Sequence, residues 1–146
     1  MSHSKPLVDV SLILKGEELD PMQVTSLLKV KGTKMRKKGQ TWRTSTNHEV
    51  TAKIGVWTLH ANRESMDLHD QIASLKRQLG SVTFEPLQVP GVQFAELDVF
   101  IAFGSSAGVD DDYKCQLTPD DLSWILGLKV PVSINISYTP ETISQT

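Results

Sequence analysis

Cysteine and histidine are the residue types in this chain that could carry nucleophilic or metal chemistry. The single cysteine, Cys115, lies just before an expected helix, where the helix dipole favours a thiolate. A thiolate nucleophile also needs a base within reach, and no histidine lies near Cys115 in the sequence. The four histidines lack the close helical spacing of metal ligands; they are His3, His48, His60 and His69. We therefore predict no catalytic residue, no metal site and no cofactor.

Five carboxylates gather around the start of one expected helix. They are Asp110, Asp111, Asp112, Asp120 and Asp121. The run of three lacks the alternating spacing and the distal glutamate of a calcium loop. Acidic residues at this density can steer a basic protein surface, and Trp124 in the same helix could anchor the contact. The alternatives are a solvated acidic loop and a Trp124 that packs against that loop. We predict a protein-binding face made of these residues.

Lysine and arginine gather in residues 29–43, which contain no acidic residue. The side chains that could follow a phosphate backbone are Lys34, Arg36, Lys37, Lys38 and Arg43. Trp42 adds a ring on which a base could stack. The formal net charge of the whole chain is −2, however, which opposes binding to a polyanion. Nucleic-acid binding is therefore an alternative function, and a solvated basic loop is the simpler interpretation.

The size and composition of the chain describe the scaffold that holds these groups. A chain of 146 residues, with 39% hydrophobic and 22% charged residues, suits one globular domain with its own core. No run approaches the ~20 apolar residues that span a bilayer. The first residues lack the basic and then apolar order of a signal peptide. We expect a single domain over residues 1–146 in the cytoplasm, without membrane contact.

Apolar periodicity and capping signals predict the elements that must position the charged groups. The expected strands are residues 8–14, 41–46, 50–59, 97–103 and 130–138. The expected helices are capped by Asp20, Ser65 and Thr118. Their expected buried stripes are Val24, Leu27 and Leu28; Leu68, Ile72, Leu75 and Leu79; and Leu122, Ile125 and Leu126. The two strands within 41–59 should form one long hairpin after a loop at 29–43.

Residues 19–30 and 117–128 match each other at a constant offset of 98 positions. In both segments a capping residue precedes a proline, and the apolar positions coincide. We therefore predict an α+β fold, with an antiparallel sheet and helices mainly on one face. The match also predicts a ferredoxin-like pseudo-duplication of a strand–helix–strand unit, about 7–60 and 94–139, with a linking helix at about 65–80. A chance likeness between two capped amphipathic helices is the alternative. The residues expected on the opposite sheet face are Trp57, Leu59, Phe100 and Ala102.

Several short segments, in a fixed order along most of the chain, resemble a known family. They are Gly16, Leu19-Asp20-Pro21, Arg36-Lys37-Lys38-Gly39, Gly55-Val56-Trp57, Leu79-Gly80, Leu117-Thr118-Pro119 and Ile134-Asn135-Ile136-Ser137-Tyr138. This order resembles a bacterial, DUF4279-like family that is described only as a domain of unknown function. The resemblance implies an α+β domain of bacterial origin and no known chemistry. Small domains of this kind often look like immunity proteins, which bind and block a toxin encoded nearby.

These observations favour a non-enzymatic protein-binding domain, and specifically an immunity-type inhibitor of a cognate bacterial toxin. Two other functions stay open. One is a nucleic-acid-associated module that uses residues 29–43, and the other is a small-ligand-binding domain with a pocket on the uncovered sheet face. The chain is expected to be a monomer or a homodimer.

Overall fold

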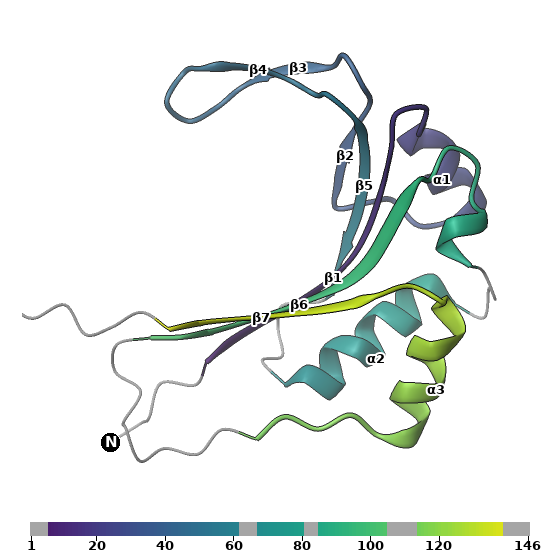
Figure 1. The fold of residues 1–146 in the computed structure, drawn as a ribbon, viewed down its shortest axis with the longest axis vertical. Helices are drawn as coiled ribbons and strands as arrows, with labels where there is room; N and C mark the ends of the chain where they lie inside the picture. The colour runs from purple at the N-terminus through teal and green to yellow at the C-terminus, as the bar shows by residue number, and fades with distance from the viewer. Residues whose placement is uncertain (1–5, 62–66, 81–84, 105–113, 139–146) are drawn as a thin grey trace, which may run out of the picture.

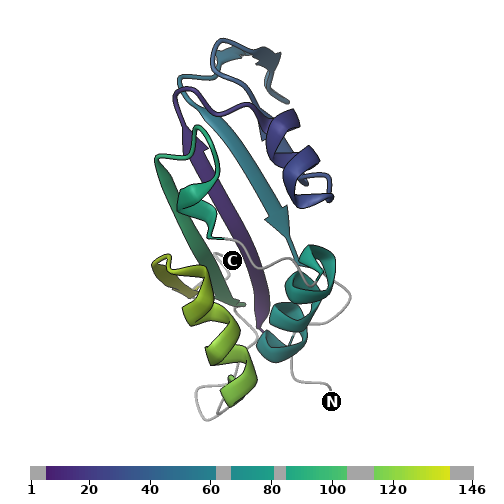
Figure 2. The ribbon, with the colours of Figure 1, turned by 90° about the vertical axis from the view of Figure 1, so that its right-hand side faces the viewer.

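The chain folds as an α+β domain in which one curved sheet carries every described helix on the same face (Figures 1 and 2). The structure, a computed structural model, describes residues 6–61, 67–80, 85–104 and 114–138. The strands are β1 (Leu7–Gly16), β2 (Lys34–Arg36), β3 (Thr41–Arg43), β4 (Glu49–Thr51), β5 (Gly55–His60), β6 (Phe94–Phe103) and β7 (Val132–Tyr138). The helices are α1 (Pro21–Leu28), α2 (Leu68–Leu79), the short 3-10 helix η1 (Pro86–Gln88) and α3 (Pro119–Leu128).

The main sheet has the strand order β2-β5-β1-β6-β7, and β3 with β4 forms a separate two-stranded arm. All neighbouring strands of the main sheet are antiparallel except β6 and β7, which are parallel. The predicted α+β class and the mostly antiparallel sheet are therefore confirmed. No helix in the described part of the chain is long and apolar enough to cross a bilayer.

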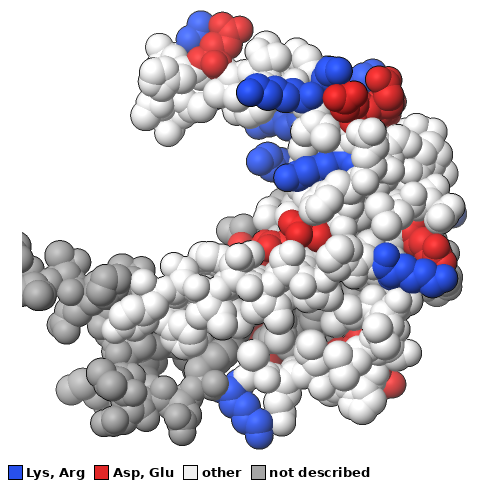
Figure 3. Space-filling view, viewed as in Figure 1, with Lys and Arg blue, Asp and Glu red and all other residues white. Residues whose placement is uncertain are grey.

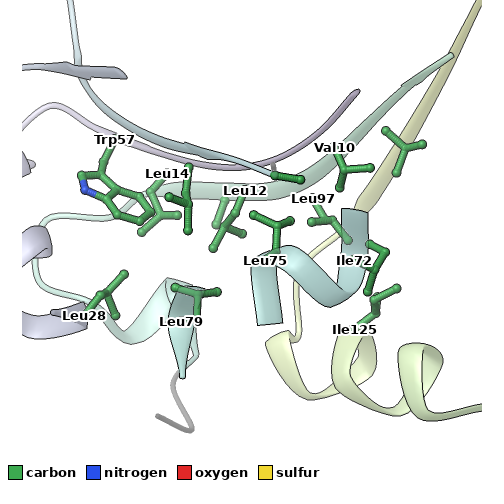
Figure 4. Packing of buried hydrophobic residues seen from close by; sticks show 14 of the residues in the cluster. Val10, Leu12, Leu14, Leu28, Trp57, Ile72, Leu75, Leu79, Leu97 and Ile125 are labelled. Atoms are coloured by element: carbon green, nitrogen blue, oxygen red, sulfur yellow. The ribbon is translucent and has the colours of Figure 1, made fainter. Parts of the chain in front are cut away.

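The core lies between the sheet and the helices, because the strands alternate apolar and polar side chains. The inward side chains of β1 are at most 2% exposed; they are Val8, Val10, Leu12 and Leu14. The predicted stripe of α2 is buried against them, from Leu68 to Leu79 (Figure 4). Trp57 and Leu59 also belong to this core, so their predicted place on the opposite face was wrong. Phe100 and Ala102 do lie on the opposite face, since their neighbours Val99 and Ile101 point into the core.

The buried rows of α1 and α3 differ from the predicted stripes. Leu27, Leu122 and Leu126 are 49%, 47% and 75% exposed, whereas Val24 and Ile125 are buried. The offset of 98 aligned the two N-terminal caps, but α3 has ten residues and α1 has eight. The matching positions Val24 and Leu122 nevertheless point in different directions, because the contact of Asp121 with His69 and the packing of Ile125 orient α3. The ferredoxin-like duplication itself stays a prediction.

Residues 34–60 form a more divided structure than the single hairpin that the sequence predicted. β3 and β4 do pair across a turn at Asn47, whose φ is 64°. The second expected strand breaks, however: Ala52 continues the pairing with Gln40, and the chain then bends at residues 53–54. β5 then joins the main sheet beside β1, and β2, which was expected to be loop, pairs along β5. The arm therefore projects from the end of the sheet (Figure 1).

Two contacts, one at each end of β1, hold this central strand against other parts of the chain. Gln71 of α2 is fully buried and bonds to the β1 backbone: Val10 N–H donates to its Oε1 at 2.9 Å, and its Nε2 donates to Val8 O. β5 ends before it reaches these groups, so the amide of Gln71 takes the place of a neighbouring strand. At the other end of β1, a Cβ on Gly16 would collide with the carbonyl oxygen of Gly91. Only glycine permits that backbone approach.

Candidate functional site

No described helix covers the face of the sheet opposite the helices. The sheet curves, and the β3–β4 arm projects over this face, so that a hollow opens between them (Figures 1 and 3). The side chains that point to this face, by the alternation of the strands, are Leu7, Asp9, Ser11, Ile13, Lys15, Lys34, Arg36, Val56, Thr58, His60, Phe94, Glu96, Asp98, Phe100, Ala102, Ser133, Asn135 and Ser137. The surface is therefore mixed, with charged, polar and aromatic groups, and we call it the open face.

Three carboxylates lie near one another in the middle of the open face. Glu96 and Asp98 follow each other on one face of β6, and Asp9 is on the adjacent strand β1. Ser133 Oγ donates to Glu96 Oε2 at 2.6 Å, and Asn135 Nδ2 donates to Asp98 Oδ1 at 3.3 Å. Partial burial, together with the charges of Glu96 and Asp9, raises the pKa of Asp98 despite the bond from Asn135. The middle of the open face therefore favours a positively charged group.

Beside these carboxylates, Ser11, His60 and Asp9 bring together the residue types of a hydrolytic triad. Ser11 Oγ lies 2.6 Å from His60 Nδ1, and Asp9 Oδ1 lies 3.9 Å from the same nitrogen. In a catalytic triad the serine and the carboxylate contact opposite ring nitrogens, and the serine is accessible to substrate. Ser11 is only 5% exposed. The arrangement described here therefore links β1 to β5 and lacks the geometry of a triad.

No local pattern in the sequence indicates this cluster, because Ser11 and His60 are 49 positions apart. The register of β1 and β5, which pairs these two residues, brings them together. The hairpin of 41–46 with 50–59 that the sequence predicts does not contain this pairing.

The predicted basic residues lie at the wall of the hollow formed by β2 and the arm. Lys34 and Arg36 of β2 point to the open face, because they pair with β5 residues on that face. The guanidinium of Arg36 lies 4.2 Å from the ring centroid of Trp42, a distance suited to a cation–π contact. Arg43 bonds to Asn47 in the turn of the arm. Lys37 and Lys38 are exposed in the turn between β2 and β3.

The structure divides the predicted acidic face. Asp110, Asp111 and Asp112 lie outside the described residues, and Asp120 is exposed in the first turn of α3. Asp121 is 5% exposed, and its side chain accepts from the backbone N–H of Thr118 in a capping box. Trp124 is half-buried against the core. Asp121 and Trp124 therefore help to hold α3 in place.

Asp121 also joins α3 to α2 through His69. His69 Nδ1 lies 2.6 Å from Asp121 Oδ2. The hydrogen bond to Asp121, and then its charge, raise the pKa of His69. Burial acts to raise the pKa of Asp121, but the bonds from His69 and Thr118 outweigh it and lower that pKa. No local pattern in the sequence indicates this pair, because the two residues are 52 positions apart, on different helices.

Metal and thiol chemistry receive no support from the part of the chain that the structure describes. No three histidine, cysteine, aspartate or glutamate side chains converge there in a way that could hold a metal ion. Cys115 is a free, exposed thiol.

Comparisons with known proteins place the chain in a family without a known activity. The chain matches no curated protein and no solved structure. A family model does match it over residues 5–137, which is most of the chain. The chain therefore belongs to the family described as Domain of unknown function (DUF4279).

Proposed function

We propose that the chain is a non-enzymatic protein-binding domain of the cytoplasm, and that it acts as an immunity-type inhibitor of a cognate bacterial toxin. The observation that carries the proposal is the open face, which is hollowed, accessible and composed like a protein interface (Figure 3). It combines aromatic side chains, such as Phe94 and Phe100, with charged and amide groups. Protein interfaces have this mixture of aromatic and polar residues.

The charges of the open face favour a partner with a protruding basic segment. Asp9, Glu96 and Asp98 lie in the middle of the face, where partial burial and the two neighbouring carboxylates raise the pKa of Asp98. A lysine or arginine from a partner would relieve that repulsion, and complementary charge speeds association. The predicted face at the start of α3 receives less support, because Asp121 and Trp124 help to hold the helix in place.

Nucleic-acid binding stays the alternative, and the Arg36–Trp42 contact is the observation that favours it. A stacked arginine and tryptophan beside Lys34 could bind a base and a phosphate. A strand that followed this wall into the hollow would, however, approach the carboxylates of Glu96 and Asp98. Phosphate binding predicts a steep loss of affinity with salt, so titration of a labelled single strand over a salt series tests this alternative.

The test of the proposed function is affinity capture from native-host cells with two charge variants of the full chain. Glu96→Gln with Asp98→Asn removes two of the three negative charges of the open face, and Glu17→Gln with Glu18→Gln makes the same charge change in an exposed turn. We expect the wild type and the turn variant to capture the same protein, and the open-face variant to bind it at least about tenfold more weakly. Equal capture by both variants would contradict the open face as the binding surface.

Inhibition is tested separately from binding. The captured partner is expressed alone and together with the chain, and growth of the cells is measured. An immunity-type inhibitor restores growth, whereas a partner that is not toxic leaves only the broader conclusion of a protein-binding domain.

The fold proposal that accompanies this function is the ferredoxin-like duplication of the units at about 7–60 and 94–139. The crossovers β1–α1–β2 and β6–α3–β7 each connect parallel strands, although β5 lies between β1 and β2. Both helices begin with a proline after the cap and end on a lysine in the left-handed region, Lys29 and Lys129. These shared features support a common origin of the two units.

A further inference from the structure

The outer edge of β7 is an apolar surface that no described element covers. β7 is the last strand of the sheet, and its side chains on the helix side are 41–66% exposed; they are Val132, Ile134, Ile136 and Tyr138. Ile134 and Ile136 pair with Val99 and Ile101 of β6, which are each 4% exposed. The apolar face that packs against the helices therefore continues onto β7, but its side chains there are exposed to solvent.

One flank of α3 extends this surface. Leu122 and Leu126 lie one turn apart, about 100° around the helix from the buried residues Asp121 and Ile125. Asp121 bonds to α2, and α2 lies over β1, on the side away from β7. Figure 2 shows α3 over the β6–β7 end of the sheet, with α2 beside it. In a right-handed β6–α3–β7 crossover, the rotation of about 100° from the buried residues turns this leucine flank toward the β7 side. The leucine side chains of α3 and the isoleucine side chains of β7 therefore face the same edge of the domain.

The edge lacks the usual protection against pairing with another strand. Natural edge strands carry lysine, proline or a bulge, and β7 contains no charged residue and no proline. Figure 3 looks onto this edge and shows a surface without charged atoms along β7. A strand that pairs with β7 would therefore meet no charge that could repel it.

The sequence of β7 identifies a second copy of the chain as the occupant. The seven residues from Val132 to Tyr138 read nearly the same in both directions: apolar, Ser, Ile, Asn, Ile, Ser, apolar. An antiparallel copy centred on Asn135 places Ile134 opposite Ile136 and Ser133 opposite Ser137. Every residue thus meets one of its own kind, which is what a two-fold interface requires.

The backbone N–H and C=O groups of β7 that the pairing requires also point away from β6. Leu97 N–H donates to Pro131 O, and the parallel register pairs Leu97 with Val132. In a parallel ladder of this register, Ser133 and Asn135 bond to β6, so the N–H and C=O groups of Ile134 and Ile136 point outward. In the antiparallel copy these outward groups lie opposite each other and can exchange both hydrogen bonds.

We propose that two copies of the chain pair through β7, antiparallel about a two-fold axis at Asn135. The two five-stranded sheets then form one continuous sheet, and the leucine flank of each α3 packs at the junction. This homodimer goes beyond the proposed function, because it uses the edge of the sheet and leaves the open face of both copies accessible.

The first experiment measures the mass of the full chain in solution by sedimentation equilibrium at about 1 to 100 µM. The chain has a mass of 16.2 kDa, and we expect twice that value for the wild type. The variant Ile134→Lys with Ile136→Lys places charges on the edge and should weaken association by at least about tenfold. Leu27→Lys, on an exposed position of α1, is the control that should keep the dimer. Circular dichroism confirms that each variant folds.

The second experiment tests the register, with Cys115→Ser as background. Asn135→Cys places two thiols across the axis, with Cα atoms about 4.5 Å apart, which is within the range of a disulfide. Ser133→Cys places its thiol about 14 Å from its own symmetry mate, four residues along the strand. We expect a cross-linked dimer only with Asn135→Cys. A monomeric wild type, a dimer that Ile134→Lys with Ile136→Lys leaves intact, or equal cross-linking by both cysteines would overturn the proposal.

Discussion

Replacement of Gln71 by methionine should destabilise the fold through two backbone groups of β1. The Gln71 amide accepts a bond from Val10 N–H and donates to Val8 O, and the two valines are at most 2% exposed. Methionine has a similar length and also favours helix, but it can make neither bond. The substitution therefore leaves one buried donor and one buried acceptor of the central strand without a partner.

The expected magnitude follows from these two groups. A buried polar group that loses its partner costs about 1–3 kcal/mol, so two of them cost about 2–6 kcal/mol. The easier burial of a thioether offsets part of this, which leaves a loss of about 2–4 kcal/mol in the free energy of unfolding. Domains of this size are stable by about 5–15 kcal/mol, so Gln71→Met should still fold, with a melting temperature roughly 5–15 °C lower.

Urea denaturation followed by circular dichroism measures this loss. The midpoint should fall while the slope stays unchanged, because the same surface is exposed on unfolding. Gln23→Met is the matched control, since Gln23 is exposed on α1, and it should change stability by less than about 0.5 kcal/mol. A Gln71→Met protein as stable as the wild type would refute the role of Gln71 as a substitute for a neighbouring strand.

Three further predictions follow from other contacts. Gly16→Ala should destabilise the chain by about 3 kcal/mol or more, because the added Cβ would meet the backbone of Gly91. Gly127→Ala has open space around it in α3, so it should be neutral or stabilising by up to about 1 kcal/mol. Urea titrations measure both changes. The pair of His69 and Asp121 should make stability pH-dependent. The raised pKa of His69 adds stability below its ordinary value of about 6.5 that is lost as the pH rises through the folded pKa, and the lowered pKa of Asp121 adds stability that is lost in acid, below about pH 4. The difference in unfolding free energy between the wild type and His69→Ala should therefore be larger near pH 5.5 than near pH 9, and an equal difference would contradict the ion pair.

The sequence predicted the elements whose patterns are local. The alternation in β1 and β7 and the stripe of α2 from Leu68 to Leu79 needed only the period of a strand or a helix. The caps of α1 and α3 at Asp20 and Thr118 were predicted correctly for the same reason. The family resemblance, which rested on the order of these elements, is confirmed.

The failures concern contacts between distant parts of the chain. Leu122 and Leu126 have a suitable spacing for a buried stripe, but the rotation of α3 is set by the bond of Asp121 to His69 and by the packing of Ile125. Similarly, β5 could be placed beside β1 only from the register of the sheet. The open face follows from that placement, and no spacing within the sequence indicated it.

Site-specific photo-cross-linking tests the central claim, that the open face binds a protein partner. A photo-reactive amino acid is placed at Phe100 on the open face, at Trp42 on the arm, or at Leu87, which is exposed on the helix side. We expect Phe100 and Trp42 to cross-link to the same discrete protein in native-host cells, nuclease treatment to leave the product unchanged, and Leu87 to give no such product. Cross-links to that protein from Leu87 alone, or products that disappear with nuclease, would contradict the claim.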